Sequence, residues 1–380
     1  MSTIFSNQNS RLLFEKCRNN ETDKAIAMIK DRENLRINVN ERFEGGCTSF
    51  FICCYLGNLK VAKILAEECN VDITLESDNI TPFTVSCVQG KVSIVEYLLT
   101  EYGNKVDIHS MITGLVGACQ YGYPQIVRRI LGKGELDINI TVDDFGATLL
   151  YVAVETENEE VVSLLLNQGS NPNISRGGYY PIHLSSQSGN LKILEILLKS
   201  DQSIETTTDV NVQAPDGATS LLIAAQNGNI KVVDLLYKYG ADPNIQMKTD
   251  GSTPLYVAAA RHHKNTVDAL LENKKLNINQ SLFDGTTALH VLAQFGHLDC
   301  IEKVFDRFQS TIIVDPKKND QSTPLHLAAR HGQYKVCQFL IDHGADITLV
   351  CDGDTPYSIA KRYGRADTIK VLEDALNNKK

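Results

Sequence analysis

The chain repeats one short motif about every 34 residues, and this internal repeat limits the folds that its 380 residues can adopt. The clearest copy reads Thr-Pro-Leu-Tyr-Val-Ala-Ala-Ala from Thr253, and close relatives of it start at Thr287 and Thr323. A single hydrophobic core stops growing at roughly 250–300 residues, so a chain of this length needs either several domains or an array of small units. Self-similarity at a fixed period is typical of an array. Weaker copies start at Thr48, Thr81, Thr113, Thr148, Tyr180, Thr219 and Thr355, and a divergent one starts near Arg11.

Each copy is expected to form two short helices. A threonine such as Thr253 is a good N-cap, because its hydroxyl accepts a backbone N–H of the first turn. The proline after it suits the first helical position, where its missing N–H costs nothing. In the second half, as in residues 229–236, apolar residues recur at i, i+3 and i+4, which predicts an amphipathic helix. Pairs such as Asp216-Gly217 predict a tight turn before the next copy.

These motifs resemble the ankyrin repeat over residues 11–376. The Thr-Pro-Leu-His motif at 323–326, the Ala-Ala pair and the terminal Gly-Ala-Asp at 240–242 all match. The resemblance implies an all-α solenoid of stacked helix-turn-helix units with β-hairpin-like tips, elongated and curved. We expect one continuous solenoid with an N-terminal capping repeat at 1–45, an array at 46–354 and a C-terminal capping repeat at 355–380, because terminal repeats need a polar outer face.

Charge and hydropathy restrict the partners. The net charge is −9 and neither half of the chain is basic, which argues against a broad surface for nucleic acid or an anionic membrane. No apolar run approaches the ~18–20 residues of a membrane span, and the polar start is unlike a secretory signal. We therefore expect a protein of the cytoplasm, with the nucleus as the alternative, that binds a protein and neither nucleic acid nor membrane. We also expect a monomer, although nothing in the sequence determines the oligomeric state.

Residues with catalytic or ligating chemistry fall on repeat positions. Most of the ten cysteines, such as Cys53, Cys54 and Cys87, replace the small alanines of other copies and are expected in the core as reduced thiols. For His183, His290 and His326, the resemblance implies a bridge between the backbones of adjacent units. His262, His263 and His331 lie elsewhere without a carboxylate or thiol at metal spacing. No phosphate loop or hydrolase motif occurs. We expect no catalysis, no cofactor and no metal.

The resemblance places a concave surface along the turn tips and the first helices. Its exposed positions are the residue before the cap threonine and those seven and eight residues after it. Aromatic and arginine side chains, which are enriched in interface hot spots, occupy several of them. The predicted partner-binding residues are Tyr55, Tyr121, Glu155, Tyr179, Arg261, Phe295, Arg330, His331, Arg362 and Tyr363.

Two features of this surface stay open. Acidic residues gather on the fifth copy, from Asp143 to Glu160, and basic ones such as Arg261 and Arg330 lie further along. They are either ordinary solvated charges or a dipolar groove that directs the acidic end of a partner toward the C-terminal copies. Residues 203–208 lengthen one copy, either as a tolerated surface insertion or as a recognition finger.

The favoured function is a non-catalytic scaffold or adaptor that binds a partner protein through the concave groove and the repeat tips. A regulator that occludes a partner enzyme's active site would use the same surface, so it remains an alternative. An enzyme hidden in the array is less favoured, because no interval between repeats offers a non-repeat block of ~100 residues.

Overall fold

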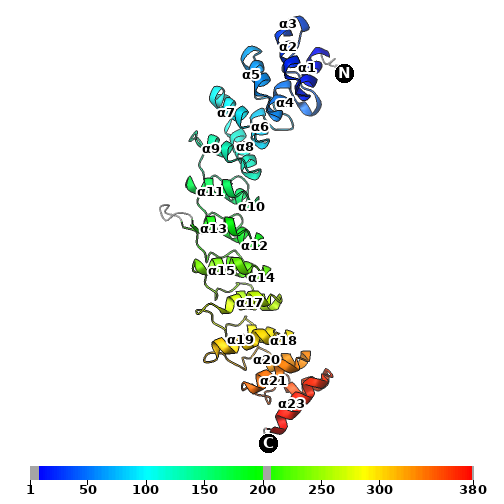
Figure 1. Cartoon of the computed structure of the whole chain (residues 1–380), viewed down its shortest axis with the longest axis vertical. Coiled ribbons are helices and arrows are strands. Elements are labelled where there is room, and N and C mark those ends of the chain that lie inside the picture. The colour runs from blue at the N-terminus through cyan, green and yellow to red at the C-terminus, as the bar shows by residue number, and fades with distance from the viewer. Residues whose placement is uncertain (1–7, 200–206, 379–380) are drawn as a thin grey trace. The chain divides into compact units, whose positions relative to one another are not determined.

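The computed structural model describes residues 8–199 and 207–378. It divides into two compact units, residues 1–177 (unit 1) and residues 178–380 (unit 2). Both are built from pairs of short antiparallel helices (Figure 1), which confirms the expected all-α repeat solenoid. Of the predicted insertion at 203–208, residues 203–206 lie outside the described part. The division into capping repeats and array remains a prediction.

The described residues of unit 1 form five helix pairs. Its first helices pack on one another in chain order, and each contacts the second helix of its own pair. The first helices are α1 (Gln8–Arg18), α4 (Ser49–Leu56), α6 (Pro82–Val88), α8 (Ile108–Gln120) and α10 (Leu149–Glu155). The second helices are α2 (Thr22–Lys30), α5 (Leu59–Glu68), α7 (Val92–Glu101), α9 (Pro124–Leu131) and α11 (Glu159–Asn167). The linkers add α3 (Arg32–Leu35), η1 (Glu44–Gly46) and η2 (Gly103–Lys105).

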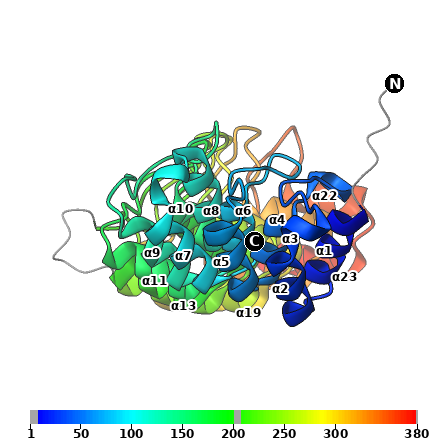
Figure 2. The same ribbon diagram turned by 90° about the horizontal axis from the view of Figure 1, so that it is seen from above.

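In unit 2, residues 178–199 and 207–378 form six pairs in the same arrangement. In Figure 1, α12, α14 and α18 follow one another on one side of this unit, and α13, α15 and α19 on the other. The view along the stack (Figure 2) places α13 and α19 on the edge opposite the hairpin loops of this unit. The first helices are α12 (Pro181–Ser188), α14 (Ser220–Asn227), α16 (Pro254–Ala260), α18 (Ala288–Phe295), α20 (Pro324–His331) and α22 (Pro356–Arg362). The second helices are α13 (Leu191–Lys199), α15 (Ile230–Lys238), α17 (Lys264–Leu271), α19 (Leu298–Phe308), α21 (Tyr334–Asp342) and α23 (Ala366–Asn378).

Threonine caps start most of the first helices, as predicted. The hydroxyl of Thr253 accepts the Tyr256 N–H at 3.2 Å, and Thr48 and Thr219 do the same for the residue three positions on. At Tyr180, where no threonine is present, the imidazole Nδ1 of His183 accepts the Tyr180 N–H at 3.2 Å, as His290 does for Thr287. This half of the capping arrangement therefore persists without the threonine hydroxyl.

The predicted start of one copy is wrong. Thr113 is not an N-cap but lies exposed inside α8, where its hydroxyl donates to the His109 carbonyl oxygen. The helix begins at Ile108, because the Asp107 carboxylate accepts the Ser110 N–H at 2.8 Å. An aspartate is as strong an N-cap as threonine, so it starts α8 more than a turn earlier. The end of α8, capped by Tyr121, keeps the register of the other copies.

Small residues let adjacent first helices approach closely. Ala258 and Ala259 of α16, like Ala328 and Ala329 of α20, are fully buried. The apolar stripe of each second helix closes the core from the other side, as Val232, Val233 and Leu236 do in α15. Each pair therefore completes its core only with its neighbours, which is the physical basis of a repeat array.

The loops between copies form tight hairpins that are joined to one another. Isolated antiparallel bridges, such as Ser281 with Thr287, confirm the predicted hairpin-like tips. Gly217 has φ +90°, which confirms the expected Asp-Gly turn, and the next tip packs directly against it. On the same loops, the Asn244 side-chain oxygen accepts the Asn277 N–H at 2.7 Å. These bonds hold consecutive tips in register.

Candidate protein-interaction surface

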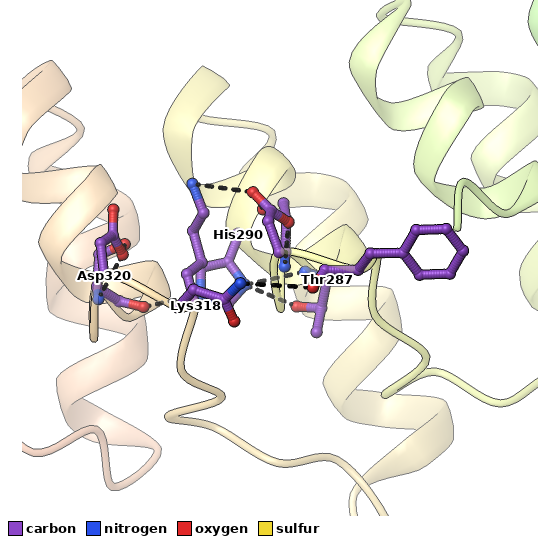
Figure 3. A network of polar contacts seen from close by, with 9 residues as sticks. Thr287, His290, Lys318 and Asp320 are labelled. Atoms are coloured by element: carbon purple, nitrogen blue, oxygen red, sulfur yellow. Dashed lines mark hydrogen bonds and ion pairs between the residues drawn. The ribbon is translucent and has the colours of Figure 1, made fainter. Parts of the chain in front are cut away.

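A histidine network links consecutive repeats of unit 2 beneath the surface. His290 is fully buried, and its Nδ1 accepts the Thr287 N–H at 3.1 Å (Figure 3). Since Nδ1 accepts a hydrogen bond, Nε2 carries the proton and donates to the Ser322 carbonyl oxygen, 3.2 Å away in the next repeat. His183 and His326 make the equivalent bonds to Val212 and Leu349. The bridging role implied by the resemblance is confirmed.

Burial keeps these three imidazoles neutral. It lowers the pKa of His290 to about 4, against a smaller opposing effect of the bond to Ser322. Burial also lowers the pKa values of His183 and His326. Only the neutral ring can accept the capping N–H and donate across the repeat boundary at once. The histidines of the motif are therefore committed to the framework and unavailable for acid–base chemistry.

The cysteines are packing residues. All ten are free thiols, and eight of them are buried, as the predicted small core positions require. Burial raises the pKa values of Cys119 and Cys337 to about 12 and also raises those of Cys54 and Cys87. A thiol needs a lowered pKa and access to solvent to act as a nucleophile, and these groups have neither.

All ten predicted partner-binding residues are exposed to solvent. Nine of them lie at the C-terminal ends of first helices or at their C-cap positions, and the tenth is Tyr179, just before α12. Both unit 1 and unit 2 have exposed first-helix ends of this kind. The residues are Tyr55, Tyr121 and Glu155 in unit 1, and Tyr179, Arg261, Phe295, Arg330, His331, Arg362 and Tyr363 in unit 2.

Arg176, which contacts the acidic residues of the fifth copy, was not among the residues predicted from the sequence. The Arg176 guanidinium lies 2.7 Å from a carboxylate oxygen of Asp143 and 3.2 Å from one of Glu155. It also lies 5.9 Å from the ring centroid of Phe145, a tip residue whose side chain is 70% exposed. Two carboxylates of the acidic group between Asp143 and Glu160 are therefore paired within unit 1. Residues 21 and 33 positions apart gave no sequence signal for this contact.

At the other end of the chain, predicted residues contact one another. The Arg330 guanidinium lies 5.2 Å from the ring centroid of Tyr363, a cation–π contact between α20 and the end of α22. Arg362 pairs with Asp354. The predicted residues Arg330, Arg362 and Tyr363 all line a cavity of about 120 Å³ between the two helices.

Two histidines also meet across a repeat boundary in unit 2. The ring nitrogens of His262 and His297 lie 3.0 Å apart, and the exposed Phe295 ring packs edge-on against His262, with centroids 4.4 Å apart. His263 lies half-buried, with its Nε2 3.0 Å from the Gln226 carbonyl oxygen. His297 was missed because it follows its cap threonine by ten residues, whereas His262 follows by nine.

Within residues 8–199 and 207–378, no cluster of three or more histidine, cysteine or acidic side chains could hold a metal ion. In the same part of the chain, no helix is both long and apolar enough to cross a bilayer.

Known proteins share this repeat over parts of their length. The human transient receptor potential cation channel subfamily A member 1 is 28% identical over 239 residues, which is 61% of this chain and 18% of the channel subunit. The Caenorhabditis elegans ankyrin repeat and KH domain-containing protein mask-1 is 27% identical over 237 residues, or 62% of this chain and 8% of that protein. Palmitoyltransferase AKR1 of Lachancea kluyveri is 26% identical over 167 residues, or 43% of this chain and 22% of the enzyme. The match thus spans less than a quarter of each relative.

A family model of ankyrin repeats, described as three copies, matches the chain in six segments between residue 13 and residue 380. The matched segments are 13–110, 115–213, 204–281, 221–311, 273–351 and 306–380. This repeat indicates a protein-interaction module, and the helix pairs, threonine caps and bridging histidines described above are its framework. The chain belongs to the ankyrin repeat family.

Proposed function

We propose that the chain binds a partner protein, without catalysis, through the exposed ends of its first helices and the neighbouring tips. The observation that carries this proposal is a division of labour along each first helix. Its buried part holds the array together, while its last residues are exposed and include Tyr55, Tyr121, Phe295 and Tyr363. Exposure of aromatic rings to water is unfavourable, and these rings lie outside the repeat core. Their regular spacing at exposed positions is typical of interface hot spots.

Partner capture from an extract of the source cell tests this proposal. The variant Phe295→Ala/Tyr363→Ala removes two exposed aromatic side chains from first-helix ends. The control Ile313→Ala/Tyr334→Ala removes two comparably exposed apolar side chains that belong neither to a first helix nor to its C-cap. Quantitative mass spectrometry should find proteins that are retained by the native chain and by the control but lost from the first variant. Equal loss from both variants, or retention by both, contradicts the proposed surface.

A scaffold and a regulator that occludes an enzyme's active site would both use these helix ends. The identity of the captured protein distinguishes them. If it is an enzyme, its activity should be measured with and without a saturating amount of the chain. Inhibition that the variant Phe295→Ala/Tyr363→Ala relieves supports the regulator, and unchanged activity supports the scaffold.

A further inference from the structure

The first helices of unit 2 carry charge of one sign only. Within the six helices and their C-cap residues the charged side chains are Arg261, Arg330, Lys361 and Arg362, and there is no aspartate or glutamate. The second helices of the same unit carry both signs, for example Lys335 and Asp342 in α21. In a chain with a net charge of −9, this face is positive against the general trend. We call these four residues the basic row.

The charge of the basic row is largely uncompensated. Of its members only Arg362 pairs with a carboxylate, that of Asp354, in the part of the chain that the structure describes. Lys361 lies over the Tyr357 ring at 4.5 Å, which leaves its charge in place. Beside the row, the Arg365 guanidinium donates to the Arg330 carbonyl oxygen and adds a further cation. Burial, and then the neighbouring Arg330 and Arg365, lower the pKa of His331, as expected for a positive local potential.

Apolar contact sites alternate with the cations. Phe295, at the end of α18, is 39% exposed and lies in the repeat between Arg261 and Arg330. Tyr363 is 43% exposed and follows Arg362 directly. The Arg330 guanidinium packs on the Tyr363 ring, which holds the guanidinium in place and leaves its N–H groups available to a ligand. A ligand with alternating negative and apolar groups would match this order.

The tips beside the row disfavour a uniform polyanion. Asp250, Asp284 and Asp320 stand at successive hairpins, where each accepts hydrogen bonds from its own turn. A nucleic-acid strand carries a phosphate at every nucleotide, and some of these would be brought toward the aspartates. A polypeptide can place carboxylates only where the cations lie.

We propose that the basic row binds an acidic segment of a partner protein, whose apolar or aromatic side chains contact Phe295 and Tyr363. This inference rests on the proposed function and adds to it the chemistry of the partner. Its binding strength should depend on ionic strength, because the row is exposed and its charges are screened by salt.

Selection from a displayed library of random peptides against the full chain tests the proposal. The selected peptides should be enriched in aspartate and glutamate. The variant Arg261→Glu/Arg330→Glu should bind them at least about tenfold more weakly at low salt, with a shallower salt dependence. The control Lys335→Glu/Lys370→Glu changes the net charge equally, on the exposed faces of α21 and α23, and should keep the affinity.

Three outcomes overturn the inference: a selection without acidic binders, acidic binders that the row variant retains, or displacement of the peptides by a single-stranded oligonucleotide at a lower concentration than by free acidic peptide. Its failure is distinct from that of the proposed function. A chain that captures a partner yet selects no acidic peptides loses only the inference. A chain that captures nothing loses the proposed function.

Discussion

The Nε2 atom of His290 lies 3.2 Å from the carbonyl oxygen of Ser322, so a single side chain joins the cap of one repeat to the loop of the next. The same ring accepts the Thr287 N–H through Nδ1. Protonation of Nδ1 would remove that acceptor and place a charge in the core. The bond between repeats is therefore coupled to the protonation state of the histidine.

Stability should fall as the pH drops from about 6.5 toward 4. The pKa of His290 in the folded chain is about 4, below the ordinary value of 6.5, so the unfolded chain takes up the proton first. The contribution is fully present above about pH 6.5 and is lost as the pH falls toward the folded value. Linkage then gives a loss of about 2 kcal/mol from His290 between pH 7 and pH 5. Urea unfolding followed by circular dichroism at the two pH values measures it.

His290→Gln is the diagnostic variant for this effect, since glutamine does not titrate. Its unfolding midpoint should change less between pH 7 and pH 5 than that of the native chain. His109→Gln, at an exposed position, should retain the native pH dependence. A native chain whose midpoint is the same at both values would refute the framework role of the neutral imidazole.

The start of α8 should depend on Asp107 and not on Thr113. Asp107→Ala removes the carboxylate that accepts the Ser110 N–H and should cost about 1 kcal/mol. Thr113→Ala should be neutral or slightly stabilising, because alanine has the higher propensity inside a helix. Urea midpoints rank the two variants, and hydrogen exchange at the Ser110 amide localises the effect. The opposite ranking would restore the predicted start at Thr113.

The fold was predictable because its determinants recur. Threonine caps, alanine pairs and motif histidines occupy the same place in many copies, so each supports the others even where one is missing, as at Tyr180. The error at Thr113 has the same origin. Periodicity fixed the end of α8 correctly but also implied a cap that Asp107 replaces with local chemistry. A repeat pattern records what copies share and conceals what one copy does differently.

For the candidate surface, the sequence predicted which positions are exposed but not which side chains contact one another. The resemblance indicated which helix ends face solvent, and all ten predicted residues do. Contacts among surface residues were not predictable, because they join side chains that no repeat relation connects. Arg176 reaches two acidic residues from a loop, and His262 meets His297 at a different offset in its copy. Both contacts depend on the relative positions of neighbouring loops, and the repeat period does not predict those positions.

Thiol accessibility should separate two cysteines from the other eight. Cys47 and Cys69 are half-buried, whereas the remaining thiols are buried. Brief labelling of the native chain with iodoacetamide, followed by peptide mass spectrometry, should modify these two alone. Full labelling should require denaturant. Burial raises the pKa of Cys69, so a higher labelling pH should increase its rate. Rapid native modification of Cys53 or Cys87 would contradict the packing described for the first helices.

Gly217 should tolerate alanine less well than Gly240. Both have φ near +90°, so an added Cβ strains the backbone in either case, by roughly 1–2 kcal/mol. At Gly217 the new Cβ would also lie 2.5 Å from the Lys248 backbone nitrogen in the next tip, whereas at Gly240 nothing lies within 4 Å. Since backbone cannot rotate away as a side chain can, Gly217→Ala must displace one tip relative to the next. Its unfolding midpoint in urea should therefore fall below that of Gly240→Ala. The Lys248 amide hydrogen, which is bonded to the Asp216 carbonyl oxygen, should also exchange with solvent faster than in the native chain. Equal midpoints for the two variants would mean that consecutive tips are not held in register by this contact.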